Sequence, residues 1–296
     1  MVYLSSVVAA LMPGNVPELP VPLSPQRPIL AAVPTVSANG IELYYERWGQ
    51  GPRLLFFNGS GSSIATSELL IKLFTNDFEV LVHDQRGLGR SEIPAGPYEM
   101  ADYAADAAAL LDQIGWDRAR VAGVSFGGMV AQEFAATSPN RVERLALLCT
   151  SPGGTSGASY PLHELASLSK EEQARRGTQL LDTRFTPEWL AGHAGDRALA
   201  DMMASRRGAE KTSEQLRGEA EQLGARSRHD VTDRLGAVTC PTFVASGRFD
   251  GIAPPANGEA IAARIPNSEF HVYEGGHAFF AQDPDALPDV ISFLRS

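Results

Sequence analysis

The chain has 296 residues, of which 44% are hydrophobic and 20% are charged. This composition is that of an ordinary soluble globular protein and excludes disorder of the chain as a whole. The formal net charge of −10 and the lack of a Lys or Arg cluster argue against nucleic acid or an anionic membrane surface as a partner, because phosphate binding needs clustered cations. No stretch approaches the roughly 20 consecutive apolar residues that a membrane span needs.

Residues 1–33 form a Pro-rich N-terminal extension ahead of the expected domain. This stretch fits three interpretations: an irregular segment packed on the domain or trailing from it, an over-long start, or a small lid. It holds a short apolar run but neither a basic n-region nor a convincing small-residue cleavage site. We therefore expect a cytoplasmic protein rather than a secreted one.

The two cysteines, Cys149 and Cys240, have neither the spacing of a metal site nor that of a redox motif. Cys149 closes one short apolar run and Cys240 precedes another. If these runs are neighbouring parallel strands, the two thiols lie at opposite ends of the sheet and beyond disulfide distance. The sequence predicts two reduced structural cysteines.

The predicted strands begin with a hairpin. Residues 35–49 alternate apolar and polar side chains around Asn39 and Gly40, a pair typical of tight hairpin turns, so an antiparallel pair is expected. Short apolar runs follow, of the kind that is buried on both faces of a parallel sheet. These runs are Arg53–Asn58, Phe78–Asp84, Ala119–Val124, Arg144–Cys149, Thr242–Gly247 and Glu269–Gly275.

Helical patterns separate the apolar runs. Apolar side chains recur at helical spacing between residues 103 and 114, and Gly115 follows as a stop signal. A second such pattern begins at Met129 and ends before Ser138. Strands that alternate with helices predict an α/β fold, here a doubly wound, mostly parallel sheet with an N-terminal antiparallel hairpin.

One segment breaks the alternation. Residues 151–228 contain no strand-like run but three helix-start signals, at Ser169, Thr186 and Thr212. We interpret this segment as an inserted helical cap, with residues 34–150 and 229–296 forming the core domain. A cap that rises from the carboxyl edge of the sheet would cover the crevice where open α/β sheets bind ligands.

A Gly-x-Ser-x-Gly motif at residues 123–127 places Ser125 where a predicted strand gives way to a helix. A serine there could simply cap the helix. The flanking glycines, however, permit a sharp turn that exposes a nucleophile and lets backbone donors approach it closely. The helix N-terminus also favours the negative charge that develops in acyl transfer. The pattern indicates that Ser125 is a nucleophile.

A serine nucleophile needs a base and an acid that orients the base. Of the six histidines, His277 alone lies in a Gly-rich turn after a late strand. Asp250 lies in the turn after the predicted strand 242–247, and the order Ser125, Asp250, His277 is the one expected for a triad on this architecture. Competing but less suitable acids are Glu274, Asp283 and Asp285.

The oxyanion of a tetrahedral intermediate needs two backbone donors. Phe126 follows the predicted nucleophile and supplies one N–H group. In the loop after the first core strand, two glycines let the N–H of Ser60 turn toward the nucleophile, so Ser60 and Phe126 are the predicted oxyanion-hole residues. Substrate-pocket candidates are Asn58, Gly59, Trp189 and Met202, the last two with packing among the cap helices as the alternative role.

Five stretches together resemble the α/β-hydrolase superfamily over residues 35–295: FFNGSG, DQRGLGRS, VAGVSFGGMVA, SGRFDGIAPP and EGGHAFF. The longer stretches around the second and third of these are similar to the 3-oxoadipate enol-lactonase group of small esterases and lactonases. Asn58 and Gly59 stand where many members have His-Gly, and here the chain resembles the enol-lactonases. Many members carry Met at the position of Phe126. The presence of Phe126 in this chain would narrow the acyl pocket.

The sequence therefore predicts a serine hydrolase that cleaves a carboxylic ester or lactone of a small molecule through an acyl-enzyme, with no metal and no organic cofactor. A carbon-carbon bond hydrolase and a cofactor-free perhydrolase would use the same triad, and a slow-turnover, receptor-like binding protein could retain it. The oligomeric state stays open. An enol-lactonase-like cap should also recognise a carboxylate, for which Arg184, Arg206 and Arg207 are candidates, with a solvated surface role as the alternative for each.

Overall fold

The chain enters its sheet through the predicted hairpin, in a computed structural model that describes residues 34–207 and 210–296. The strands β1 (Thr35–Ala38) and β2 (Ile41–Trp48) pair antiparallel. Asn39 and Gly40 both have positive φ, 49° and 78°, as a tight turn of the primed type requires. The predicted extension, residues 1–33, lies outside the described residues.

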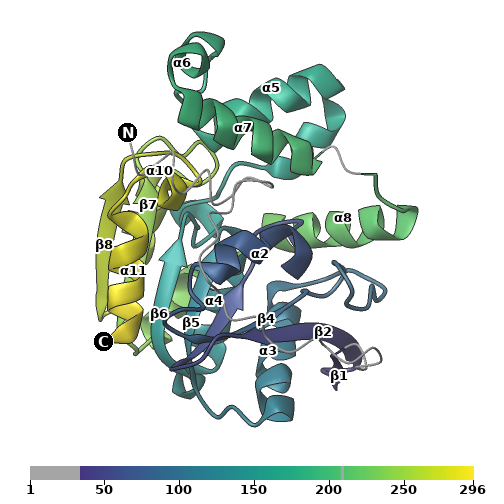
Figure 1. The fold of residues 1–296 in the computed structure, drawn as a ribbon. Coiled ribbons are helices and arrows are strands. Elements are labelled where there is room, and N and C mark those ends of the chain that lie inside the picture. Colours follow the sequence, from purple (N-terminus) through teal and green to yellow (C-terminus); the bar gives the residue numbers. More distant parts are fainter. Residues whose placement is uncertain (1–33, 208–209) are drawn as a thin grey trace, which may run out of the picture.

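The sheet has eight strands in the order β1-β2-β4-β3-β5-β6-β7-β8 (Figure 1). Strand β2 pairs antiparallel with β4, and the remaining neighbours pair in parallel, which confirms the doubly wound, mostly parallel sheet. The parallel strands coincide with the predicted apolar runs. They are β3 (Arg53–Phe57), β4 (Glu79–His83), β5 (Ala119–Val124), β6 (Val142–Leu148), β7 (Thr242–Gly247) and β8 (Ser268–Tyr273).

Two core clusters lie on opposite faces of this sheet. In β3, Leu55 and Phe57 belong to one cluster and Leu54 and Phe56 to the other, because successive side chains of a strand point to opposite faces. The first cluster is covered by α3 (Met100–Ile114), α4 (Phe126–Thr137) and α9 (Pro255–Ala262). The second is covered by α2 (Ile64–Lys72), α10 (Phe279–Gln282) and α11 (Ala286–Arg295).

Helices fill the segment between β6 and β7, which we call the insertion (residues 149–241). Its α-helices are α5 (Lys170–Leu181), α6 (Pro187–Gly192), α7 (Ala194–Arg207) and α8 (Ser213–Ser227), and its short 3-10 turns are Gly154–Ser156, Leu162–Ser167 and Thr232–Ala237. Ser169, Thr186 and Thr212 cap α5, α6 and α8 as the sequence predicts, whereas α7 has no counterpart among the predicted helix starts. Figure 1 shows α5, α6 and α7 gathered beyond one end of the sheet.

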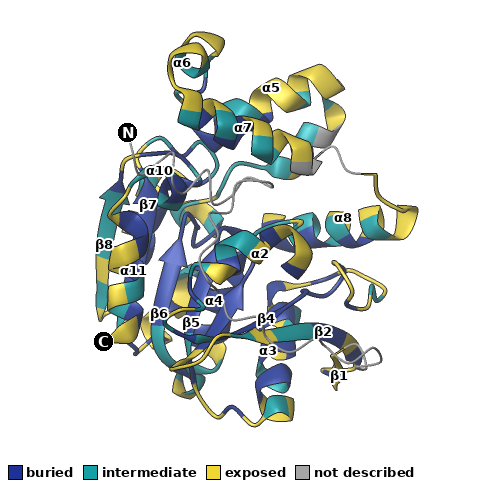
Figure 2. Ribbon diagram, in the orientation of Figure 1, coloured by how far each residue is buried: buried dark blue, intermediate teal, exposed yellow. Residues whose placement is uncertain are grey.

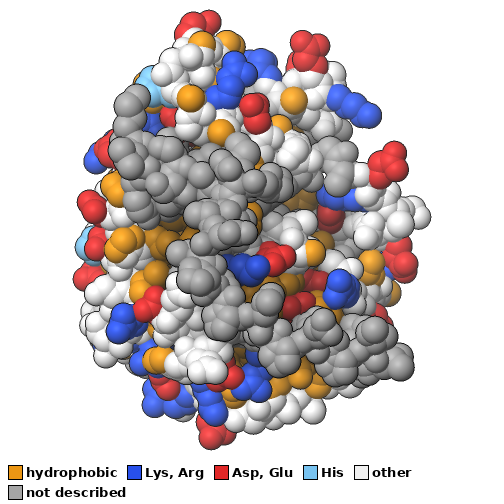
Figure 3. Space-filling model, viewed as in Figure 1, with side chains coloured by type: hydrophobic (Ala, Val, Ile, Leu, Met, Phe, Trp, Pro, Cys, Tyr) orange, Lys and Arg blue, Asp and Glu red, His pale blue; other side chains and the backbone are white. Residues whose placement is uncertain are grey.

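The burial pattern follows this layered arrangement. Figure 2 shows the central strands buried and the outward faces of α5 and α8 exposed. On the face drawn in Figure 3, basic and acidic side chains are interspersed. No helix in residues 34–207 and 210–296 is long and apolar enough to cross a membrane.

Hydrogen bonds of buried side chains fix the loop after β4. The carboxylate of Asp84 accepts from the backbone N–H of Ile64 (2.6 Å) and of Arg90 (2.8 Å). Arg86 holds the buried carboxylate of Asp106 on α3 with two hydrogen bonds, of 2.7 and 2.6 Å. This loop is therefore tied both to α2 and to α3.

The backbone is tightly constrained at the turn between β5 and α4. Ser125 has φ 56° and ψ −116°, a conformation that a residue with a side chain adopts only under strain. A Cβ on Gly127 would lie 2.1 Å from the carbonyl oxygen of Phe57, and one on Gly123 would lie 2.3 Å from that of Gly127. Glycine is therefore required on both sides of Ser125, which explains the spacing of the motif.

This strain predicts an unusual order of stability for two variants of Ser125. Both Ser125→Gly and Ser125→Ala remove the hydroxyl, but only glycine also releases about 1–3 kcal/mol of backbone strain. After the entropic cost of glycine, about 0.5–1 kcal/mol, Ser125→Gly should be more stable than Ser125→Ala by up to about 2.5 kcal/mol in urea denaturation. The control, Ala105→Gly on the exposed face of α3, should be destabilised. A Ser125→Gly variant that is less stable than Ser125→Ala, as in the control pair, would contradict the strain.

Candidate active site

Three loops at the carboxyl edge of the sheet bring together the three residues predicted as a triad. Ser125 precedes α4, Asp250 follows β7 and His277 follows β8. His277 Nε2 lies 2.9 Å from Ser125 Oγ, and His277 Nδ1 lies 2.7 Å from Asp250 Oδ2. Because a carboxylate only accepts, Nδ1 carries the proton and donates to Asp250, which leaves Nε2 free to accept from the serine hydroxyl.

Asp250 is fixed on both of its oxygens. Its side chain is fully buried, and Oδ1 accepts from the backbone N–H groups of Ile252 and Ala253, both at 2.8 Å. The other oxygen is left to His277. A carboxylate held in this way can set the orientation and tautomer of an imidazole.

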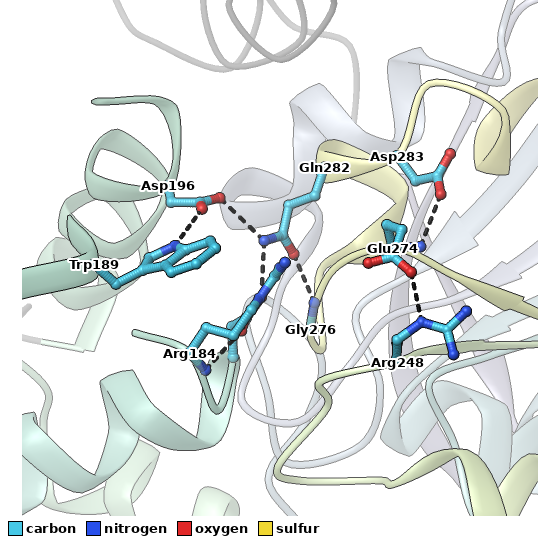
Figure 4. A network of polar contacts seen from close by, with 9 residues as sticks. Arg184, Trp189, Asp196, Arg248, Glu274, Gly276, Gln282 and Asp283 are labelled. Atoms are coloured by element: carbon cyan, nitrogen blue, oxygen red, sulfur yellow. Dashed lines mark hydrogen bonds and ion pairs between the residues drawn. The ribbon is translucent and has the colours of Figure 1, made fainter. Parts of the chain in front are cut away.

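The competing acids are engaged elsewhere. Glu274 forms an ion pair with Arg248, and Asp283 accepts from the backbone N–H of Glu274 at 2.8 Å (Figure 4). Asp285 is the residue that precedes α11, and its backbone N–H donates to Asp283. None of these three carboxylates forms a hydrogen bond with His277 in the described part of the chain.

The loop that carries His277 is held by the insertion. The backbone N–H of His277 donates to the carbonyl of Leu181 at 2.6 Å. Gln282 Oε1 accepts from the N–H of Gly276 at 2.8 Å, and its Nε2 donates to Asp182 at 3.0 Å and to Asp196 at 3.1 Å (Figure 4). The sequence analysis missed Gln282, Asp182 and Asp196, because no local pattern distinguishes these polar residues before the fold brings them together.

A cavity of about 410 Å³ opens beside Ser125 and His277. Core and insertion both contribute to it, and Asn58, Gly59 and Met202 are among the predicted pocket residues that line it. Most of its other side chains are aliphatic, including Leu70, Leu73, Leu162, Leu165, Leu180 and Leu199. The chemistry of this wall suits an apolar ligand.

Trp189 differs from the expectation, since it is not among the residues that line this cavity. Its ring stacks on His193 with 3.8 Å between centroids, and its Nε1 donates to Asp196 at 2.8 Å. The guanidinium carbon of Arg184 lies 5.0 Å from the centroid of the Trp189 ring, and Arg184 forms an ion pair with Asp182. These partners hold Trp189 within the insertion, which was the alternative role.

Of the predicted oxyanion-hole residues, Phe126 follows Ser125 in the chain and Ser60 lines the same cavity as Ser125. Phe126 is the first residue of α4, where an N–H group has no acceptor within the helix. Ser60 lines the cavity, and its neighbour Gly59 passes so close that a Cβ there would lie 3.7 Å from that of Ser125. The next residue, Gly61, donates to Gln222 Oε1 of α8 at 2.7 Å, a contact that the sequence analysis missed.

The cysteines and the buried histidines lack the features of reactive groups. Cys149 and Cys240 are free and buried, and burial raises the pKa of both thiols. Burial also lowers the pKa of His83 and of His229 to about 4, so both imidazoles are neutral near pH 7. Within residues 34–207 and 210–296, no group of three or more His, Cys, Asp and Glu side chains could hold a metal ion.

Comparison with known proteins agrees with this architecture. The family described as "alpha/beta hydrolase fold" matches residues 52–284. The chain is 31% identical to poly(3-hydroxyalkanoate) depolymerase of Ectopseudomonas oleovorans, with 82% of this chain and 84% of that one covered. It is 28% identical to 3-oxoadipate enol-lactonase 2 of Acinetobacter baylyi, with 88% and 95% covered.

Solved structures show the same fold. The enol-lactonase from Burkholderia xenovorans LB400 superimposes with a TM-score of 0.74 at 23% identity and covers 89% of this chain and 100% of its own. At this identity the likeness concerns the fold alone. Together with the match of the family over most of the chain, it shows that this protein belongs to the α/β-hydrolase fold family.

Proposed function

We propose that the protein is a serine hydrolase that cleaves a carboxylic ester or lactone of a small molecule through an acyl-enzyme. The observation that carries the proposal is the hydrogen-bonded chain from Ser125 through His277 to Asp250, which begins at the wall of an apolar cavity. The hydrolases among the relatives support the reaction class.

In the proposed first step, Ser125 Oγ attacks the carbonyl carbon and His277 Nε2 takes the hydroxyl proton. Asp250 stabilises the imidazolium that results and keeps its Nδ1 proton in place. The N–H groups of Ser60 and Phe126 donate to the oxyanion, and the N-terminus of α4 adds a favourable field. Collapse of the intermediate expels the alcohol, which takes the proton from His277.

In the second step, His277 removes a proton from water, and the resulting hydroxide attacks the acyl group on Ser125. The same two donors stabilise the second oxyanion. Collapse returns the proton to Ser125 and releases the carboxylic acid. For a lactone, the alcohol and the acid are two ends of one product, so the leaving hydroxyl stays tethered until this step.

The charge of the cavity wall narrows the proposed substrate class. Among the described lining residues there is one carboxylate, Glu219, which is paired with Lys211 at 2.7 Å, and there is no Lys or Arg. Arg184, a predicted carboxylate-binding candidate, is already paired with Asp182, and the side chains of Arg206 and Arg207 lie outside the described residues. We therefore propose an uncharged ester or lactone with an apolar acyl group, rather than the carboxylate-bearing substrate expected of an enol-lactonase.

A panel of neutral aryl esters and lactones, beside matched esters that carry a free carboxylate, tests this proposal. Neutral members should be hydrolysed with the higher kcat/KM. Hydrolysis of a vinylogous diketone alone would favour the carbon-carbon hydrolase, and peroxide-dependent halogenation would favour the perhydrolase. Tight binding with no turnover of any member would favour the receptor-like alternative.

The role of the acid is tested by a matched pair of amide substitutions. Asp250→Asn should lower kcat about 10⁴-fold, because the amide favours the wrong tautomer of His277. Glu274→Gln removes a carboxylate that pairs with Arg248 instead, so its kcat should stay near that of the wild type. Steady-state hydrolysis of one aryl ester measures both. Loss of activity in Glu274→Gln with activity kept in Asp250→Asn would exclude Asp250 as the orienting acid.

The role of the Ser60 backbone is tested by a second pair. Ser60→Pro removes the N–H group, and loss of one oxyanion donor typically lowers kcat about 10²–10³-fold. Ser60→Ala keeps the N–H and removes a buried hydroxyl that has no hydrogen-bond partner among the described residues, so it should be nearly neutral. Thermal denaturation checks that both variants fold. Equal kcat in the two folded variants would rule out this donor.

A further inference from the structure

A second cavity, of about 470 Å³, lies between the end of α8 and the loop after β6. It shares no lining residue with the cavity beside Ser125, so it is a separate site. Its lining side chains include Ser151, Arg226 and His229, none of which takes part in the proposed reaction. One of these lining residues, Arg226, is a buried cation with unusual surroundings.

Arg226, in the last turn of α8, is a buried cation with an unused hydrogen-bonding edge. The residue is 5% exposed, and its Nη1 donates to the carbonyl of Tyr160 at 2.8 Å. Its Nε and Nη2 are buried and have no hydrogen-bond partner in the part of the chain that the structure describes. An unpaired buried charge is costly, and removing it from water without a partner opposes folding.

The unused edge is the one that this protein elsewhere offers to carboxylates. Arg86 donates through Nε and Nη2 to the two oxygens of Asp106, at 2.7 and 2.6 Å. Arg184 donates through the same two atoms to Asp182, at 2.9 and 2.6 Å. A planar fork of this kind matches a carboxylate in a bidentate manner.

No carboxylate of the described residues fills that place. Asp250 is near enough to influence Arg226 electrostatically, but its oxygens are used by His277 and by two backbone N–H groups. Asp230 lines the cavity but accepts from the N–H of Thr232. Burial lowers the pKa of Arg226 to about 10, which still leaves the guanidinium charged at neutral pH.

The other polar groups favour a single negative charge on the ligand. His229 is neutral near pH 7, and the hydroxyl of Ser151 has no hydrogen-bond partner among the described residues. Arg228, which also lines the cavity, is already paired with Glu99. Arg226 is thus the lining cation whose Nε and Nη2 have no hydrogen-bond partner among the described residues, and a neutral donor stands beside it.

We propose that this second cavity binds a small carboxylate, which the Nε and Nη2 groups of Arg226 hold side-on, with the hydroxyl of Ser151 as a further donor. The site is distinct from the proposed catalytic cavity. The bound carboxylate would pair with Arg226 as Asp106 pairs with Arg86 and Asp182 pairs with Arg184. Binding is therefore expected to stabilise the fold.

Acetate is the probe, with chloride at equal concentration as the control for ionic strength. Acetate should raise the Tm of the wild type in a saturable way beyond the effect of chloride. Arg226→Lys keeps the charge but lacks the fork, so its affinity for acetate should fall at least tenfold. Arg217→Lys makes the same change on α8 in a residue that does not line the cavity, and it should bind acetate like the wild type.

A measurement on the wild type separates the two cavities, whatever the stability of the variants. Met129 lines the second cavity, whereas Met202 and Met203 line the one beside Ser125. In protein labelled with ¹³C at the methionine methyls, acetate should shift the Met129 signal, which Met129→Leu assigns. Shifts at Met202 and Met203 alone, no saturable binding, or equal affinity in Arg226→Lys would each overturn the proposal.

Discussion

The strained turn at Ser125 is the constraint on which the arrangement of the site depends. Its backbone is held from two sides, since the N–H of Ser125 donates to Leu148 at 2.9 Å and its carbonyl accepts from Thr150 at 2.8 Å. Glycine on each side of Ser125 lets β3, β5 and α4 approach closely enough to hold the Ser125 backbone in its strained conformation. Because parallel strands end at a common edge, the loops after β7 and β8 can then reach the same point with Asp250 and His277.

The insertion does more than line the cavity. Leu181 accepts from the backbone of His277, and Gln282 joins the loop of that histidine to Asp182 and Asp196 of the insertion. On the other side, Gln222 of α8 accepts from Gly61, next to Ser60. The insertion thus contacts both the loop of the proposed base and the loop of a proposed oxyanion donor, so movement of these helices would alter the geometry of both.

The features that sequence predicted are those that short patterns determine. Alternation and the Asn39–Gly40 pair indicate the hairpin, apolar runs indicate the buried strands, and the glycines around Ser125 follow from one sharp turn. Chain order and turn position then single out Asp250 and His277. The misses have two causes. Only His193 separates α6 from α7, so no clear start marks α7. The partners of Trp189, Gln282 and Arg226 exist only in the folded chain, and those of Gln282 and Arg226 lie far away in the sequence.

The central claim is that Ser125 becomes acylated during turnover, and intact mass spectrometry tests it most directly. The enzyme is mixed with a neutral aryl ester, quenched in acid within the first turnovers, weighed and digested. The account predicts a mass increase equal to the acyl group, carried by the peptide that contains Ser125 and absent from Ser125→Ala. Hydrolysis at full rate in Ser125→Ala, or an acyl group on another residue, would contradict it.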